Sequence, residues 1–233
     1  MENFLIKYYM FIIYGIQLVA VVAGLIFYKK YKATPVTFFI KIIFYLFLVQ
    51  FLGSYAHYYD TFDFLNSIYN SVFRNNYWYF TIFFDIGAIV LFSIFFQRIL
   101  TVKLHVKVLK IATYLFVFFA TVYLLVNYQK FFYQYFSLLQ IIGALVMILS
   151  SVLYYLELLQ SNTILKFYST IYFYIASAIF VWWIITTPIS FFDLYTRGSD
   201  WNFIFLEWQI YLFANFFMYL VFTIGLIVSK PEK

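Results

Sequence analysis

This sequence has no cysteine and only two histidines among its 233 residues. Without cysteine, the chain cannot form disulfides, thiolate nucleophiles, iron–sulfur clusters or cysteine-ligated zinc sites. The two histidines, His57 and His105, fall on what we predict to be opposite sides of a membrane, so they cannot share a zinc ion or a haem. We therefore expect no metal site and no cofactor.

Charge is scarce as well. Charged residues make up 10% of the chain, whereas hydrophobic residues make up 66% and aromatic residues 27%. A typical soluble domain carries about 25% charged residues, so this composition indicates an integral membrane protein. The net charge of +6 does not predict nucleic-acid binding, because most basic residues flank apolar segments, where they contact anionic lipid head groups.

Motifs that would carry chemistry are missing too. The sequence contains no G-x-S-x-G elbow, no P-loop and no paired-carboxylate motif, and it has no recognisable channel filter or charged ring. The last apolar segment has no lysine that could bind retinal. We therefore expect no catalytic residues, and a protein that is not an enzyme.

Seven long apolar segments predict an all-α, polytopic membrane protein that forms a single domain over residues 1–233. Each segment has about 18 to 25 residues, which is enough to cross a bilayer as a helix. The predicted spans are 8–28, 37–59, 77–96, 111–128, 132–156, 167–189 and 205–228.

The basic residues predict the orientation of these spans. Of the 15 Lys and Arg residues, only Lys7, Arg74, Lys130 and Arg197 lie on one side. The other eleven lie on the first, third and fifth connections and at the C-terminus. They are Lys29, Lys30, Lys32, Lys41, Arg98, Lys103, Lys107, Lys110, Lys166, Lys230 and Lys233. Lys and Arg resist translocation, so we expect the N-terminus outside and the C-terminus in the cytoplasm.

Two outer connections are longer than tight turns. Between the second and third spans, apolar residues recur at helical spacing behind Asp60 and Thr61, which predicts a short amphipathic helix over about 61–74. This helix would lie on the outer surface, where it either lids a cavity or only covers the end of the bundle. The last outer connection, 193–202, reads as a polar loop.

Asp85 is the one acidic residue well inside a span, and an ionisable group at that depth is a candidate functional residue. It lies roughly 12 Å below the outer end of its helix, at about 1.5 Å of rise per residue. Polar or aromatic residues of other spans reach a similar level or climb from it to the outer surface. They are Gln17, Gln50, Ser54, His57, Gln140, Trp183, Gln209 and Asn215.

Two interpretations of this polar layer remain open. In the first, the second, third, sixth and seventh spans enclose an outward-opening ligand pocket with Asp85 as its floor and Trp183 as a wall. In the second, the polar side chains only hydrogen bond between packed helices, each bond contributing about 0.6 kcal/mol. In both, we expect Asp85 to be largely protonated and hydrogen bonded to Gln50 or Gln17, because no cation is available inside the spans.

The sequence also resembles a group of small seven-helix membrane proteins of Bacteroidetes bacteria that has no assigned activity. The similarity covers nearly the whole length. The residues that carry it are Tyr77-Trp78-Tyr79-Phe80 with Asp85, then Tyr154-Tyr155-Leu156-Glu157-Leu158-Leu159, then Asn215 with Thr223-Ile224-Gly225. This chain departs from the group at Gln50, where an acid is common, and at Tyr211, where a histidine is common. The resemblance implies the seven-helix fold and its orientation, and we expect the protein in the inner membrane of a bacterium.

Together these observations predict a non-enzymatic membrane protein. It would be a receptor-like, signal-relaying module, or an accessory subunit of a larger membrane complex. Its partners would be membrane lipids and, for a subunit, a protein within the membrane. The alternative is a small-molecule or proton-coupled transporter, or a lipid-modifying enzyme, that uses Asp85.

Overall fold

The computed structural model of the chain describes residues 2–161, 164–195 and 201–231. Within these ranges the fold is entirely helical, and seven helical segments are long and apolar enough to cross a membrane. This confirms the predicted fold class. Residues 196–200 of the predicted polar loop lie outside the described residues.

Six of the seven spans are single long helices. A helix satisfies all its backbone hydrogen bonds internally, which a chain in hydrocarbon requires. All six begin or end at least four residues from the predicted bounds. The first, fourth and seventh spans begin earlier than predicted, because their polar first turns do not belong to a pattern of apolar residues. The six helices are α1 (Glu2–Phe27), α2 (Val36–Gly53), α6 (Lys103–Val126), α7 (Ser137–Gln160), α8 (Ile171–Tyr195) and α9 (Trp201–Val228).

The third span is built differently. It begins as α4 (Tyr77–Phe80), continues as a π-helix, η5 (Thr81–Ala88), and ends as α5 (Ile89–Ile99). A π-helix is rare and is often found at functional sites. Here it contains Asp85, and the hydroxyl of Tyr45 on α2 donates to the Phe83 carbonyl oxygen at 2.6 Å.

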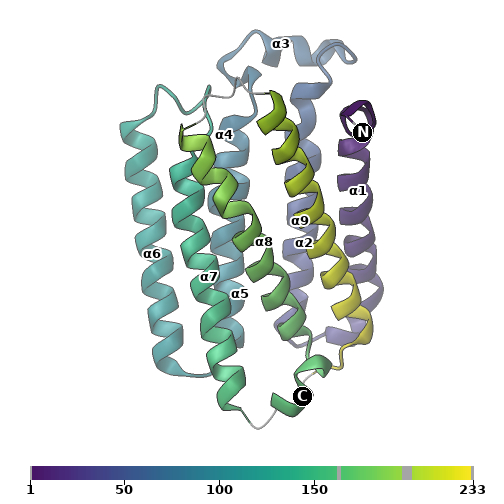
Figure 1. Cartoon of the computed structure of the whole chain (residues 1–233), viewed down its shortest axis with the longest axis vertical. Helices are drawn as coiled ribbons and strands as arrows, with labels where there is room; N and C mark the ends of the chain where they lie inside the picture. The colour runs from purple at the N-terminus through teal and green to yellow at the C-terminus, as the bar shows by residue number, and fades with distance from the viewer. Residues whose placement is uncertain (1, 162–163, 196–200, 232–233) are drawn as a thin grey trace.

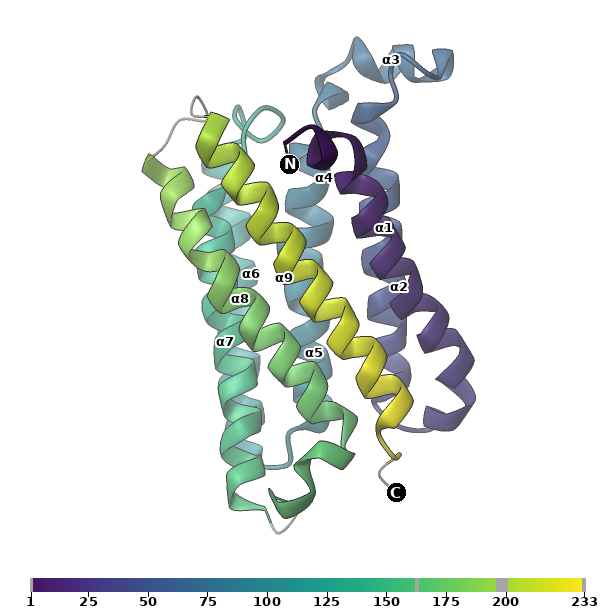
Figure 2. The ribbon, with the colours of Figure 1, turned by 45° about the vertical axis from the view of Figure 1, so that its right-hand side comes forward.

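The helices form one bundle in which the two termini lie at opposite ends (Figure 1). We call these ends the α3 end, where the chain begins and the short helix α3 (Asn66–Tyr69) lies, and the C-terminal end. Helix α7 is the most enclosed of the spans, because 67% of the residues in its most apolar stretch are buried. The corresponding share for α6, at the edge of the bundle, is 22%. Helix α9 packs against both α1 and α8, so the last span joins the first to the sixth (Figure 2).

The segment over the α3 end is not the continuous amphipathic helix predicted for 61–74. It consists of three short turns, η3 (Asp63–Leu65), α3 (Asn66–Tyr69) and η4 (Val72–Arg74). Polar side chains break it, because Ser71 accepts a hydrogen bond from the Phe73 amide and starts a new turn at η4. The prediction of one helix was therefore wrong.

This outer segment is tied to the end of α2, which continues into the short turn η2 (Ser54–His57). The hydroxyl of Tyr55 donates to the Phe73 and Asn75 carbonyl oxygens, at 2.6 and 3.1 Å. Asn76 donates from Nδ2 to the Gly53 carbonyl oxygen at 2.8 Å. These bonds hold the start of α4 beside the end of α2.

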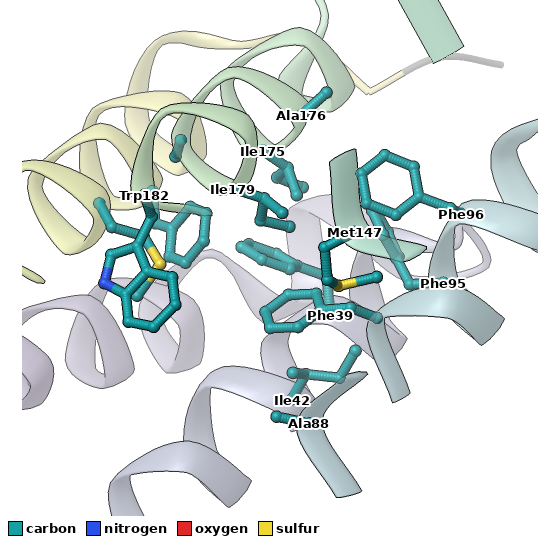
Figure 3. Close-up of a cluster of buried hydrophobic side chains, with 14 of the residues drawn as sticks. Phe39, Ile42, Ala88, Phe95, Phe96, Met147, Ile175, Ala176, Ile179 and Trp182 are labelled. Carbon is teal, nitrogen blue, oxygen red and sulfur yellow. The ribbon is translucent and has the colours of Figure 1, made fainter. Parts of the chain in front are cut away.

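In the half of the bundle toward the C-terminal end, the interior is mainly apolar and closely packed (Figure 3). The ring of Phe39 on α2 lies 5.6 Å from that of Phe95 on α5 and 4.9 Å from that of Phe222 on α9, measured between centroids. Helices α5 and α7 approach closely at Gly143, where an added Cβ would overlap the Cδ1 atom of Ile89. Small residues permit such close approach in membrane bundles.

Two hydrogen-bonded ties hold the C-terminal end together. Tyr31, in the turn η1 (Tyr28–Tyr31), is fully buried. Its hydroxyl donates to the carbonyl oxygens of Leu226, in the last turn of α9, and of Ser229, directly after α9, both at 3.1 Å. Glu157 on α7 accepts hydrogen bonds from the Thr101 and Val102 amides, at 2.7 and 3.1 Å. The carboxylate thereby fixes the connection between α5 and α6, and this accounts for a residue of the Tyr154–Leu159 motif.

Candidate functional site

A cavity of about 270 Å³ lies in the half of the bundle toward the α3 end. Its rim includes Tyr77 and Tyr135, which are each 38% exposed, and its depth includes Gln17 and Gln140, which are 5% and 4% exposed. This gradient of exposure shows that the cavity opens toward the α3 end. Its volume is at the lower end of the range for ligand pockets, about 300–1,000 Å³.

The cavity is polar without being charged. Its lining combines five side-chain amides, five tyrosines and four apolar side chains, and holds no Asp, Glu, Lys, Arg or His among the described residues. The lining residues are Tyr9, Ile13, Gln17, Gln50, Asn76, Tyr77, Phe80, Phe84, Tyr135, Gln140, Trp182, Tyr211, Asn215 and Tyr219. Asn76 and Tyr135 lie on connections, and the others come from six of the seven spans, α6 contributing none.

Four of the predicted site residues line this cavity, namely Gln17, Gln50, Gln140 and Asn215. The three glutamines were predicted at this level from their distance to the outer ends of their helices, and Asn215 was predicted nearer the middle of its span. Helices that cross the same bilayer bring residues of equal depth to one level, so this part of the prediction required no knowledge of helix rotation.

Four other predicted residues are not in the lining. Ser54 is buried but donates to the Phe51 carbonyl oxygen at 2.6 Å, within its own helix turn. His57 is exposed at the end of η2, and Gln209 is half-buried on α9. Trp183 instead borders a second, much smaller cavity of about 20 Å³, whereas its neighbour Trp182 borders both cavities.

Asp85 lies behind the wall of the cavity, at 1% exposure, and is not part of the lining. Gln140 donates from Nε2 to Asp85 Oδ1 at 2.9 Å, and Ser190 on α8 donates to Gln140 Oε1 at 2.8 Å. The expected partners, Gln50 and Gln17, do not bond to it in the structure, and Asp85 is not the floor of the pocket. The π-helix directs its side chain toward α7, which no sequence pattern indicated.

A second hydrogen bond orients the floor of the cavity. Trp182 donates from Nε1 to Asn215 Oδ1 at 3.0 Å, which joins α8 to α9. The ring of Phe84 meets that of Trp182 edge to face, with centroids 6.1 Å apart. Beneath them lies the small cavity of about 20 Å³, which has room for about one water molecule, and then the packed core.

The sequence did not reveal several contributors. Ser190 reads as an ordinary polar residue near the end of a span. The lining tyrosines could not be distinguished among the 25 in the chain. Asn76 lies directly before α4, and its side chain bonds to the Gly53 carbonyl oxygen and makes no cap bond. Only depth within the span could have suggested these residues.

Nothing in the described part of the chain resembles a metal centre, since no group of three or more His, Asp or Glu residues could hold an ion there. No protein-family model matches the sequence, and no curated protein or solved structure matches it either. The functional argument therefore depends on the geometry of the cavity.

Proposed function

We propose that this chain is a receptor-like membrane protein that binds a small, uncharged, polar molecule from outside the cytoplasmic membrane of a bacterium. The observation that carries this proposal is the cavity of about 270 Å³, which opens toward the α3 end and is lined by amides, hydroxyls and aromatic rings. Convergent polar groups in an otherwise apolar bundle are typical of ligand sites.

The side from which the ligand enters follows from the basic residues. Eleven of the 15 Lys and Arg residues fall on the connections at the C-terminal end or at the C-terminus, which favours a cytoplasmic location for that end. The cavity opening would then face outward. A ligand could reach Gln50 and Asn215 without crossing the bilayer.

The packing below the cavity favours a receptor over the transporter alternative. A transporter needs a second route from its site to the other side of the membrane. Beneath Trp182, the described interior is packed mainly with apolar side chains such as Phe39, Phe95 and Phe222, each less than 1% exposed. A polar solute would have to part this core in order to cross.

The cavity also weighs against the two remaining alternatives. A purely structural accessory subunit would be expected to have a closed interior, and this bundle is open at one end. A lipid-modifying enzyme acting through Asp85 would need that carboxyl group to reach its substrate, but Asp85 lies behind Gln140. Relay of a signal would use the contacts of Trp182 with α9 and the core.

Cysteine accessibility tests the proposal directly, because the natural chain is free of cysteine. Gln50→Cys would place one thiol in the cavity, and Gln129→Cys and Lys166→Cys would place thiols in the exposed connections at the two ends. Each variant is treated with a membrane-impermeant maleimide in spheroplasts and in inverted vesicles. We expect Gln50→Cys to react only in spheroplasts, together with Gln129→Cys.

Other outcomes would select another function. Reaction of Gln50→Cys from both sides would indicate alternating access and a transporter. No reaction from either side, with both control thiols reactive, would mean a closed interior and would favour the accessory subunit. In that case, gentle purification and mass spectrometry should reveal a stoichiometric protein partner.

A further inference from the structure

The hydrogen bonds around the cavity fix which polar atoms it offers to a ligand. An indole N–H can only donate, so the bond from Trp182 Nε1 requires Asn215 to present its carbonyl oxygen to the tryptophan. The Asn215 NH₂ group has no hydrogen-bond partner among the described residues. Asn215 lines the cavity, so at this position the cavity offers a donor.

Gln140 is fixed in a similar way from two sides. Its NH₂ group donates to Asp85 and its carbonyl oxygen accepts from Ser190. An amide has two N–H bonds, and the bond to Asp85 uses one of them. Gln140 therefore adds a second donor to the cavity wall, and Asp85 acts as a positioning residue for it.

Gln17 offers the opposite polarity. Its NH₂ group donates to the Tyr219 hydroxyl at 3.2 Å, while its carbonyl oxygen is buried and has no hydrogen-bond partner among the described residues. A buried acceptor without a partner is costly, and a donor that arrives with a ligand would remove that cost. These three amides thus present two donors, on α7 and α9, and one acceptor, on α1.

The remaining lining sets the shape. Phe80, Phe84 and Trp182 contribute aromatic surface to the same cavity. A flat ring can lay both faces on aromatic side chains while its edge makes hydrogen bonds, whereas a sugar is puckered and carries hydroxyl groups around its whole ring, each of which needs a polar partner. No charged side chain of the described lining would balance an ionic ligand.

We propose that the cavity binds a flat, uncharged heterocycle that carries C=O and N–H groups on its edge, as a nucleobase or a comparable lactam does. The C=O groups would accept from Asn215 and Gln140, and an N–H group would donate to Gln17. This inference depends on the proposed function, since it assumes that the cavity is a binding site.

Uracil and 1,3-dimethyluracil form a matched pair of probes. Both have the flat ring and two carbonyl groups, but the methylated compound has lost both N–H donors. We expect saturable uracil binding to the purified full-length chain in lipid nanodiscs, measured by equilibrium dialysis. Dimethyluracil should bind at least about tenfold more weakly, because Gln17 would keep an unpaired acceptor. Glucose should not compete with uracil.

The variant Gln17→Leu provides the second measurement. It should weaken uracil binding about tenfold or more and leave dimethyluracil binding unchanged, which abolishes the preference. Gln97→Leu is the control, because Gln97 lies near the end of α5, outside the cavity lining. The comparison of the two probes on the unaltered chain remains valid even if Gln17→Leu does not fold.

Three results would overturn the ligand class: no uracil binding, equal binding of the two probes, or displacement of uracil by glucose. The proposed function is judged separately by Gln50→Cys. If that thiol reacts from outside and uracil does not bind, the outward-open site stands and only the ligand class fails. If the thiol is inaccessible, both proposals fail.

Discussion

At the scale of single residues, the most informative position is Asp85, which supports the cavity without reaching it. A carboxyl group in the membrane interior is costly, and this one is enclosed by its own π-helix and by Gln140. Its role in the structure is to hold the Gln140 amide in one orientation. The buried chain from Ser190 through Gln140 to Asp85 links three spans behind the wall of the cavity.

Substitutions at Asp85 should separate this supporting role from a chemical one. Asp85→Asn keeps an oxygen that can accept from Gln140, so we expect a protein that folds and remains within about 1 kcal/mol of the wild-type stability. Asp85→Leu leaves the buried Gln140 N–H unpaired and should cost about 1–3 kcal/mol. Unfolding followed by circular dichroism in detergent would measure both, and equal stability of the two variants would contradict this role.

At the scale of elements, the π-helix shows how neighbouring helices shape one another. Gly87 lies where an added Cβ would be 2.5 Å from the Tyr45 hydroxyl, the same hydroxyl that donates to Phe83. Glycine is therefore required at this point by the approach of α2. The Tyr45 hydroxyl occupies the space that a side chain at Gly87 would need, so the two positions depend on each other.

This dependence predicts that substitutions at Gly87 and Tyr45 have non-additive effects on stability. Gly87→Ala should destabilise the protein by about 1–3 kcal/mol because it pushes the Tyr45 hydroxyl away from Phe83. Once Tyr45→Phe has removed that hydroxyl, adding Gly87→Ala should cost markedly less. Unfolding free energies of the two single variants and the double variant would show this coupling as a difference of at least about 0.5 kcal/mol. Strict additivity would contradict the contact.

The packing of α5 against α7 makes a second prediction at this scale. Gly143→Ala would place a Cβ against Ile89 and Phe116 and should lower stability by about 1–3 kcal/mol. Gly15→Ala on α1 is the matched control, because nothing lies within 4 Å of the added atom. It should be neutral or stabilising by about 0.5–1 kcal/mol, since alanine favours helix. Thermal unfolding in one detergent compares the two, and the prediction fails if they behave alike.

The rotation of a helix about its axis limits what the sequence can predict at this scale. Depth along a span follows from counting residues, and Gln17, Gln50 and Gln140, which were predicted at one level, line the same cavity. The direction in which a side chain points cannot be obtained by counting, because adjacent residues such as Trp182 and Trp183 point about 100° apart in a helix of 3.6 residues per turn. Every span here is apolar on most sides, so hydrophobicity could not choose between the two tryptophans. The π-helix turned Asp85 in a further unpredictable direction.

At the scale of the whole molecule, the fold was predictable and its opening was not. Seven apolar segments dictate seven helices, because a bilayer leaves few alternatives. Whether the polar residues at one level enclose a cavity or fill it depends on side-chain packing among six spans. Tyrosines line the rim of the cavity at the α3 end, whereas small and interlocking apolar residues pack the helices together at the other end.

The distribution of basic residues predicts how the whole molecule sits in the membrane. Green fluorescent protein fused after Lys233 should fluoresce, and alkaline phosphatase fused there should be inactive, because the C-terminus is expected in the cytoplasm. Alkaline phosphatase inserted after Gln129 should be active. The reverse pattern would invert the topology and would turn the cavity toward the cytoplasm.

The tie between Tyr31 and the end of α9 has a consequence for the biogenesis of the protein. Tyr31 follows the first span, and its partners Leu226 and Ser229 are synthesised 195 and 198 residues later. Until α9 enters the membrane, α1 has neither this bond nor its neighbour, and the face that will receive α9 must be covered by lipid or by the insertion machinery. The bundle is thus closed only once α9 has entered the membrane, and a chain that stops before Leu226 would be left as an open arc for quality-control proteases to recognise.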